Sequence, residues 1–423
     1  MIIDLNSSKI YIYYPYFLYS NYNLELLLDE HYRKPDIRCI QGIIFDNEKL
    51  IVVKDVPPNL TYLDCSFNKL EKLPKLNNNL RTLICIGNKI KDIPEFPSYL
   101  EKIDCSLNKL KCLPRLPIKL KHLNCEFNLL SSLPYLPLRL NYLNCSFNRI
   151  KKLPVLPESL RFLCCRLNNI KMVPPLPYHL NKLYVSFNNI EKLFYLPPNI
   201  KELIVNGNKL KEIPYLPNCI QSFYCRGNQI EQLPPLPKSI EILDCSFNKI
   251  EKLPILPKNI KILFCHSNLI SKLPKLQHLT HLKKINGMIN RMETIPPLPK
   301  SLEVLNLDNN LITYISSFSI NLKEIYLNEN ELETIPNLPE NLEKLFISGN
   351  HIKSIPELTI ENNIISEIKL SKDPRSLVIG FLNSLPSHLK ELDCSYNKLE
   401  KLPNIPDSLT CIECSYNLSK LNV

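Results

Sequence analysis

Apolar residues recur along this chain with a period of twenty positions. In the period that begins at Leu60, Leu63 and Cys65 stand two apart, as the core-facing residues of a short strand do. Leu70 and Leu73 supply further inward positions on the way back. One period cannot bury its apolar residues alone, so the pattern predicts that successive periods stack into a solenoid with a continuous core.

An asparagine occupies one fixed position of each period, three residues after the position of Cys65. We expect it to end the strand and to bond through its side-chain amide to backbone groups of its own turn and the next, which makes a ladder. The regular part of this ladder comprises Asn68, Asn88, Asn108, Asn128, Asn148, Asn168, Asn188, Asn208, Asn228, Asn248 and Asn268. The period then slips by two residues and resumes with Asn290.

The second half of each period is rich in proline, as at Pro94 and Pro97. Proline fixes φ and removes a backbone donor, so this leg is predicted to be extended and polyproline-II-like rather than helical. The strands should pair in parallel, one per period, at a spacing of about 4.8 Å.

The repeated motif, L-x-x-L-x-C-S-x-N-x-L-x-x-L-P-x-L-P, resembles the repeat of the leucine-rich-repeat family. Residues 240–257 match this motif closely. Its L-P-x-L-P half is similar to the short repeats of bacterial effectors and of leucine-rich-repeat proteins of giant DNA viruses. The resemblance covers about residues 38–423. It implies a fold that is α/β by convention but mostly β: a right-handed solenoid with a parallel concave sheet and an extended (PPII-like) convex side.

The repeats also suggest a division of the chain. Solenoids need caps, and residues 1–37 are predicted to form an N-terminal cap region. A degenerate first repeat follows at 38–57, then regular repeats at 58–356, in which the insertion near 278–284 is expected to bulge from a loop. Residues 357–383 are an irregular insertion or truncated repeat. Terminal repeats occupy 384–423, and their open edge suggests self-association.

Composition excludes several classes of protein. The chain of 423 residues has only 7 glycines and lacks G-x-G-x-x-G and P-loop motifs, which argues against nucleotide-binding enzymes. The net charge of +11 comes from lysines mixed with glutamates, as in a solvated face. We find neither a signal peptide nor an apolar run that could span a membrane. We therefore expect an intracellular, cytoplasmic protein (in the host cytoplasm if viral), whose 16 cysteines are thiols.

No catalytic or metal-binding constellation stands out. Most cysteines share a slot that valine and leucine fill elsewhere, so they are read as core residues. Cys164 is predicted on the concave face, where a reactive thiol is the alternative reading. Cys411-x-x-Cys414 is only half a zinc site. His278 and His281 fall on a predicted loop and are expected to be exposed. No metal, cofactor or catalytic residue is predicted.

The remaining candidate is the concave surface, where the third, fifth and seventh positions of each period are expected to face solvent. Its middle is rich in aromatic residues and arginine, the types enriched at binding hot spots. The predicted partner-binding residues are Phe162, Arg166, Tyr184, Tyr224, Arg226 and Phe264. The alternative is that these side chains only pack against one another as cross-strand pairs.

The leading functional hypothesis is a non-enzymatic scaffold that binds an unknown protein, a host protein in a viral or effector setting, through the concave face. One alternative is binding of nucleic acid or an anionic surface through the lysine rows, although the interleaved glutamates make nucleic acid the less favoured partner. A third is a substrate-recognition subunit of a ubiquitin ligase. Catalysis is not expected.

Overall fold

Residues 58–336, 339 and 342–350 are described in the computed structural model of the chain, together with Ile51, Val56 and short strands nearer its two ends. The chain divides into two compact units, Met1–Asn208 and Lys209–Val423, called unit 1 and unit 2 below. Apart from those short strands, the predicted cap (1–37), the insertion at 357–383 and the terminal repeats at 384–423 lie outside the described residues. The predicted self-association edge and the half zinc site lie outside them too.

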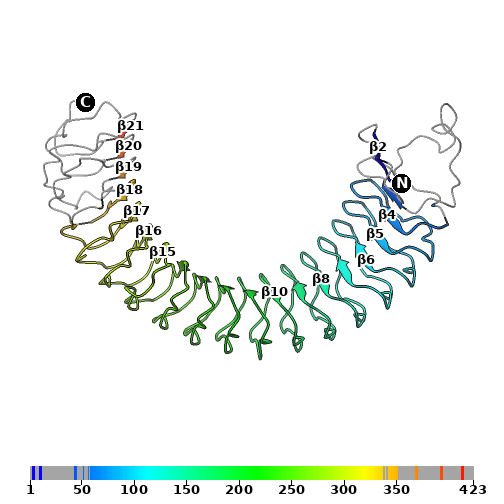
Figure 1. Cartoon of the computed structure of the whole chain (residues 1–423), viewed down its shortest axis with the longest axis horizontal. Helices are drawn as coiled ribbons and strands as arrows, with labels where there is room; N and C mark the ends of the chain where they lie inside the picture. The colour runs from blue at the N-terminus through cyan, green and yellow to red at the C-terminus, as the bar shows by residue number, and fades with distance from the viewer. Residues whose placement is uncertain are drawn as a thin grey trace. The chain divides into compact units, whose positions relative to one another are not determined.

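Unit 1 carries one three-residue strand in each period. Strands β1 and β2 pair antiparallel, whereas β3 to β11 form a parallel sheet in chain order (Figure 1). The register advances by one period, so that Leu63 faces Ile43 on one side and Leu83 on the other. The strands are β1 (Ile2–Asp4), β2 (Lys9–Tyr11), β3 (Gly42–Ile44), β4 (Tyr62–Asp64), β5 (Thr82–Ile84), β6 (Lys102–Asp104), β7 (His122–Asn124), β8 (Tyr142–Asn144), β9 (Phe162–Cys164), β10 (Lys182–Tyr184) and β11 (Glu202–Ile204).

Unit 2 continues the same design, again with parallel neighbours in chain order. Leu263 faces Ile285, so the two-residue slip falls between β14 and β15. The strands are β12 (Ser222–Tyr224), β13 (Ile242–Asp244), β14 (Ile262–Phe264), β15 (Lys284–Asn286), β16 (Val304–Asn306), β17 (Glu324–Tyr326), β18 (Lys344–Phe346), β19 (Glu367–Lys369), β20 (Glu391–Asp393) and β21 (Cys411–Glu413).

The insertion in unit 2 is absorbed into the core, so the expectation of a bulging loop is wrong. Leu279 is fully buried between two tight turns, because it adds one more inward leucine to its coil. His278 is half-buried, with Nε2 3.0 Å from the carbonyl oxygen of Leu256, whereas His281 is exposed as expected.

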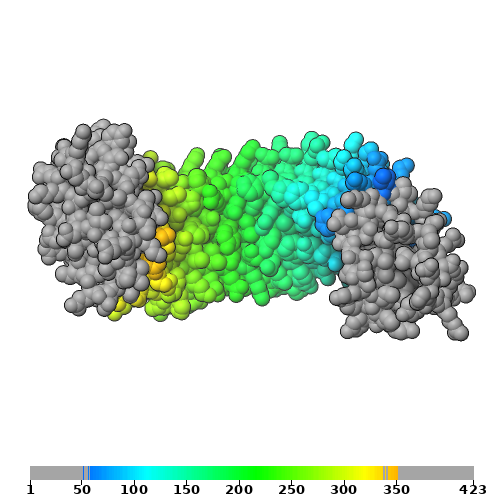
Figure 2. Space-filling model, turned by 90° about the horizontal axis from the view of Figure 1, so that it is seen from above, coloured from blue at the N-terminus to red at the C-terminus, as the bar shows by residue number. Residues whose placement is uncertain are grey.

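Each period forms one coil whose apolar residues point inward. Leu60, Leu63, Cys65 and Leu70 are fully buried, and their counterparts line the core of both units. The return legs are extended, and the described residues contain no helix. Figure 2 shows the coils of unit 1, from blue to green, packed against one another. The predicted leucine-rich-repeat solenoid with an extended return side is confirmed.

The asparagine amides bond coils together in one direction. Asn88 Nδ2 donates to the carbonyl oxygens of Cys85 in its own coil (3.3 Å) and Cys65 in the preceding coil (2.9 Å). Its Oδ1 accepts from the backbone N–H of Leu70, also in the preceding coil, at 3.0 Å. The inter-coil partners therefore lie in the preceding coil, not in the next as expected, because the turn packs over the end of the strand before it.

In unit 1 the seventh position of a period is buried where it holds serine, which corrects the expectation that it faces solvent there, whereas Arg226 at this position in unit 2 is exposed. Ser66 and Ser146 are 4% and 2% exposed. Their hydroxyls accept hydrogen bonds from backbone N–H groups of the following coil, Ile86 and Arg166, at 3.3 and 3.2 Å. The serine thus replaces water for a backbone donor that the strand pairing leaves open.

Candidate functional site

The outer face of the parallel sheet in unit 1, here called the strand face, carries an aromatic cluster on four consecutive strands. The His122 and Tyr142 rings stack with centroids 3.9 Å apart, and Tyr142 stacks on Phe162 at 4.5 Å. The Tyr184 ring meets Phe162 edge-on at 5.2 Å. These side chains are half-buried, so the cluster presents a continuous aromatic surface that still reaches solvent.

Arg166 completes this cluster. Its guanidinium carbon lies 4.5 Å from the centroid of the Tyr184 ring, a cation–π contact. Its Nε is buried and has no hydrogen-bond partner among the described residues. A buried donor without an acceptor is costly, so the hydrogen-bonding capacity of the Arg166 guanidinium is not fully satisfied in this conformation.

The charge of the cluster at neutral pH rests on Arg166. Burial, followed by the nearby Lys102 charge, lowers the pKa of His122, so this imidazole is neutral. Burial and the Glu202 carboxylate raise the pKa of Tyr184, so this phenol stays protonated. Lys182 is paired with Glu202 at 3.0 Å. The site therefore combines apolar rings with one cation that favours an anionic or carbonyl acceptor.

The other three predicted residues belong to unit 2. Tyr224 and Phe264 are half-buried on the strand face, and Lys284 Nζ lies 5.9 Å from the Phe264 ring centroid. Arg226 is exposed, with its guanidinium carbon 4.6 Å from the Phe247 ring centroid. The six predicted partner-binding residues thus fall into two sets, one in each unit. The cross-strand packing that was the alternative reading is present in unit 1, and binding at either set stays a prediction.

The cysteines that share the strand position of Cys65 have the character of core residues, whereas Cys112 is exposed. Cys145 and its ladder neighbours are fully buried, and burial raises their thiol pKa values. Cys164 on the strand face is 7% exposed, with Sγ 3.0 Å from Ser146 Oγ. Burial raises its pKa too, although Ser146 and Arg166 act in the opposite direction. This thiol is therefore protonated at neutral pH and lacks an activated nucleophile's chemistry.

His122 and Tyr142 occupy the third position of their periods, which was expected to face solvent, but they are not among the predicted site residues. The twenty-residue register places both in line with Phe162, so it could have identified them as part of the site. A second feature was missed altogether: the residue before each ladder asparagine is often large, apolar and exposed, as at Phe127 and Phe147.

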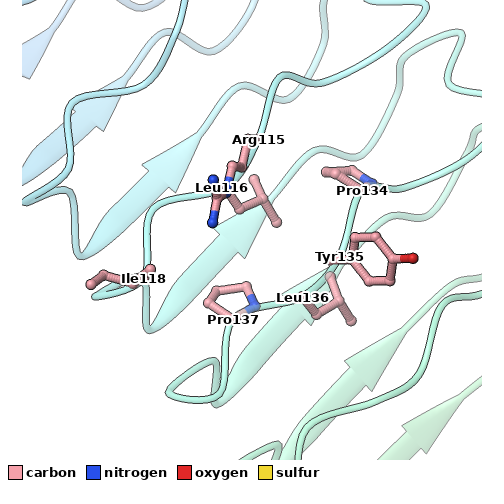
Figure 3. A pocket seen from close by; sticks show the side chains of 7 residues that line it. All are labelled: Arg115, Leu116, Ile118, Pro134, Tyr135, Leu136 and Pro137. Carbon is pink, nitrogen blue, oxygen red and sulfur yellow. The ribbon is translucent and has the colours of Figure 1, made fainter.

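A cavity of about 590 Å³ opens between two return legs of unit 1 (Figure 3). Pro134 and Leu136 of one leg face Leu116 of the other, and Arg115 is the charged residue of the lining. Tyr135 at its rim is 93% exposed. The lining holds no pair of acid and base groups. In the described part of the chain, no three His, Cys, Asp or Glu side chains gather as a metal site would require, and no helix could span a membrane.

Comparisons with known proteins agree with this architecture. The family model of the leucine-rich repeat matches residues 388–417. The chain is similar to YopM from Yersinia enterocolitica WA-314, with 29% identity and a TM-score of 0.77 over 90% of this chain and 88% of that one. The chain is a leucine-rich-repeat protein.

Two further structures share the fold of this leucine-rich-repeat protein. The functional domain of InlJ from Listeria monocytogenes, which includes a cysteine ladder, is 20% identical, with a TM-score of 0.53 over 75% of this chain and 70% of that one. The ectodomain of the Arabidopsis thaliana receptor kinase GASSHO1/SCHENGEN3, in complex with CASPARIAN STRIP INTEGRITY FACTOR 2, is 19% identical, with a TM-score of 0.50 over 91% and 62%. No curated protein matches the sequence.

Proposed function

We propose that the chain is a non-enzymatic scaffold that binds a partner protein through the strand face of unit 1. The observation that carries this proposal is Arg166, which combines a buried, unpartnered Nε with a guanidinium held on the Tyr184 ring. Tyrosine and arginine in a rigid, partly desolvated setting are the residue types that dominate protein interfaces. A carboxylate of the partner would pair with this guanidinium.

The rigidity of the surface supports the same proposal. His122, Tyr142 and Phe162 are stacked in register on paired strands, so a partner meets side chains that have little rotamer freedom left to lose. The GASSHO1/SCHENGEN3 ectodomain in its complex has the same class of fold. The proposed setting is intracellular, since the cysteines described from Cys65 to Cys265 are free thiols. The proposal includes a host protein as the partner, with this chain acting as a viral or effector protein.

Binding of nucleic acid or an anionic surface through the lysine rows is the second candidate. The observation in its favour is that exposed basic side chains, such as Lys69, Lys89 and Lys109, recur at one position in unit 1. Against it, the strand-face rings lie on one another, so their faces are not open to bases. A role as a substrate-recognition subunit of a ubiquitin ligase stays a prediction.

The test compares a site variant with a matched control in the same unit. Arg166→Ala with Tyr184→Ala removes the cluster's cation and its ring, while Arg139→Ala with Tyr135→Ala removes the same residue types from the exposed return leg. Partners are captured quantitatively from cell lysate and then measured with purified protein by calorimetry.

We expect the site variant to weaken binding of the captured partner at least about tenfold, while the control binds as wild type does. Thermal melting should show both variants folded. An identical set of captured proteins for wild type and the site variant would refute the proposal. The second candidate would be supported if wild type bound an oligonucleotide rather than a protein, with an affinity that falls as the salt concentration rises.

A further inference from the structure

Unit 1 has a second unusual surface along the turn that follows its strands. The residue before each ladder asparagine adopts the left-handed conformation, with φ between 50° and 55° for the apolar members. These side chains are exposed to between 39% and 57%. Together they form what we call the apolar ridge: Phe67, Leu107, Phe127, Phe147, Leu167 and Phe187.

The fold itself does not require large residues at this position. Glycine adopts positive φ without a steric penalty, and the chain uses it at Gly87 and Gly207 of unit 1. In unit 2, the same position is apolar only at Phe247 and Ile289 among the described residues, and elsewhere it holds Gly227, Ser267, Asn309, Glu329 and Gly349. Phenylalanine and leucine in this conformation are strained. Strain retained at so many coils of one unit points to a use for the side chains.

The ridge is unbroken from Leu107 to Phe187, whereas Gly87 interrupts it after Phe67. The rings of Phe127 and Phe147 stack with centroids 3.8 Å apart and an interplanar angle of 14°. A groove of about 640 Å³ runs along it, and its lining includes Lys109 and Leu129 beside the ridge residues. The apolar row and Lys109 of the adjoining lysine row thus lie on one surface.

The surroundings of the ridge are basic. The charged residues at the three exposed positions that follow each asparagine in unit 1 are mostly Lys and Arg: Lys69, Lys72, Lys89, Lys91, Lys109, Lys111, Arg149, Lys151, Lys152, Lys171 and Lys192. The acidic residues at those positions are Glu71, Asp92 and Glu191. In unit 2 the two signs are balanced at the same positions, as in Glu231, Lys249, Glu251 and Lys252. The basic excess therefore accompanies the apolar ridge in the same unit.

We propose that the apolar ridge and its lysine rows dock an acidic amphipathic segment of another protein. Carboxylates of such a segment complement the lysine rows, while its apolar side chains fill the groove along the ridge. This surface is distinct from the strand face. A single-stranded nucleic acid fits less well, because the stacked ridge rings cover each other's faces. A membrane surface also fits less well, because it favours apolar side chains that project beyond their neighbours, and the ridge side chains are about half covered.

The test uses a fluorescent synthetic peptide that alternates Asp with Leu and Phe. One control peptide replaces each Asp by Asn, and another replaces each Leu and Phe by Ser. The ridge variant is Phe127→Gly with Phe147→Gly, which should fold because glycine suits positive φ. Phe247→Gly, at the same position of unit 2, is its matched control. Lys109→Gln and Lys249→Gln form the corresponding pair for charge.

We expect wild type to bind the acidic amphipathic peptide, with an affinity that falls as salt rises. The ridge variant should bind at least about tenfold more weakly, and Lys109→Gln measurably more weakly, while both unit 2 controls match wild type. The proposal is overturned if the acidic peptide does not bind, if the Asn peptide binds equally well, or if the ridge variant is unaffected. It is also overturned if a single-stranded oligonucleotide or a phosphatidylserine vesicle binds the ridge in preference to the peptide.

Discussion

Asn148 offers a direct measurement of what the asparagine ladder contributes. Its Nδ2 donates to the carbonyl oxygens of Cys125, Cys145 and Ser146 at 2.9–3.1 Å. Its Oδ1 accepts from the backbone N–H of Leu130 at 2.9 Å. The side chain is 9% exposed, so water cannot readily replace these bonds. Asn148→Ala therefore removes the acceptor of the Leu130 N–H and one donor from each of three carbonyl oxygens.

The expected magnitude follows from these contacts. The Leu130 N–H would be buried without an acceptor, which costs about 1–3 kcal/mol. The two hydrogens of Nδ2 are shared among three carbonyl oxygens, so about two further hydrogen bonds are lost, at about 1 kcal/mol each. We therefore expect Asn148→Ala to lower the free energy of unfolding by about 3–5 kcal/mol. Asn148→Asp keeps the acceptor for Leu130 but turns an oxygen toward three carbonyl oxygens, so it should be similarly destabilising at neutral pH.

The assay is urea unfolding combined with amide hydrogen exchange. The control is Asn169→Ala, an exposed asparagine in the next coil, which should change stability by less than about 0.5 kcal/mol. Because coils contact mainly their neighbours, the loss of exchange protection should centre on the coils of Leu130 and Asn148. Equal effects of Asn148→Ala and Asn169→Ala, with unchanged protection at Leu130, would refute the reasoning.

Three further outcomes are expected. Gly87→Ala should destabilise unit 1, because φ is +64° and the new Cβ would lie 2.7 Å from the Phe67 ring; urea unfolding should show that Phe67→Ala relieves part of this loss. Iodoacetamide followed by mass spectrometry should label exposed Cys112 in the native protein and buried Cys145 only after denaturation. Burial raises the pKa of Asp308 to about 6, so its folded form binds a proton more readily than its unfolded form. The free energy of unfolding of wild type should therefore fall, relative to that of Asp308→Asn, as the pH rises from about 4 to about 6. Plots of unfolding free energy against pH that stay parallel for the two proteins would contradict this.

The twenty-residue period was sufficient to predict the coil. The spacing of Leu63 and Cys65 can be satisfied only by a short strand with one buried face, and the prolines exclude a helix on the return leg. The period also sets the strand register, which places His122, Tyr142 and Phe162 in line. The contact of Phe162 with Tyr184 is diagonal between strands, so it depends on side-chain rotamers that the repeat does not specify.

Several features that sequence reasoning missed involve the turn after the strand. Inward and outward positions alternate along the strand, and the prediction extended this alternation to Ser66, which was expected to face solvent. The turn instead buries Ser66 against the next coil. Positive φ was not expected at Phe127, because glycine is the usual signal for it. The apolar ridge escaped notice for the same reason: without the left-handed turn, a phenylalanine beside a ladder asparagine reads as one more core residue.

The direction of the asparagine bonds has a consequence for synthesis of the chain. The N–H of Leu130 finds its acceptor in Asn148, eighteen residues later, and the same offset recurs at Leu110 and Ile150. A nascent coil emerging from the ribosome is therefore completed only by the coil translated after it. Folding should advance one turn behind translation, and a stalled chain would expose one unfinished turn whatever its length.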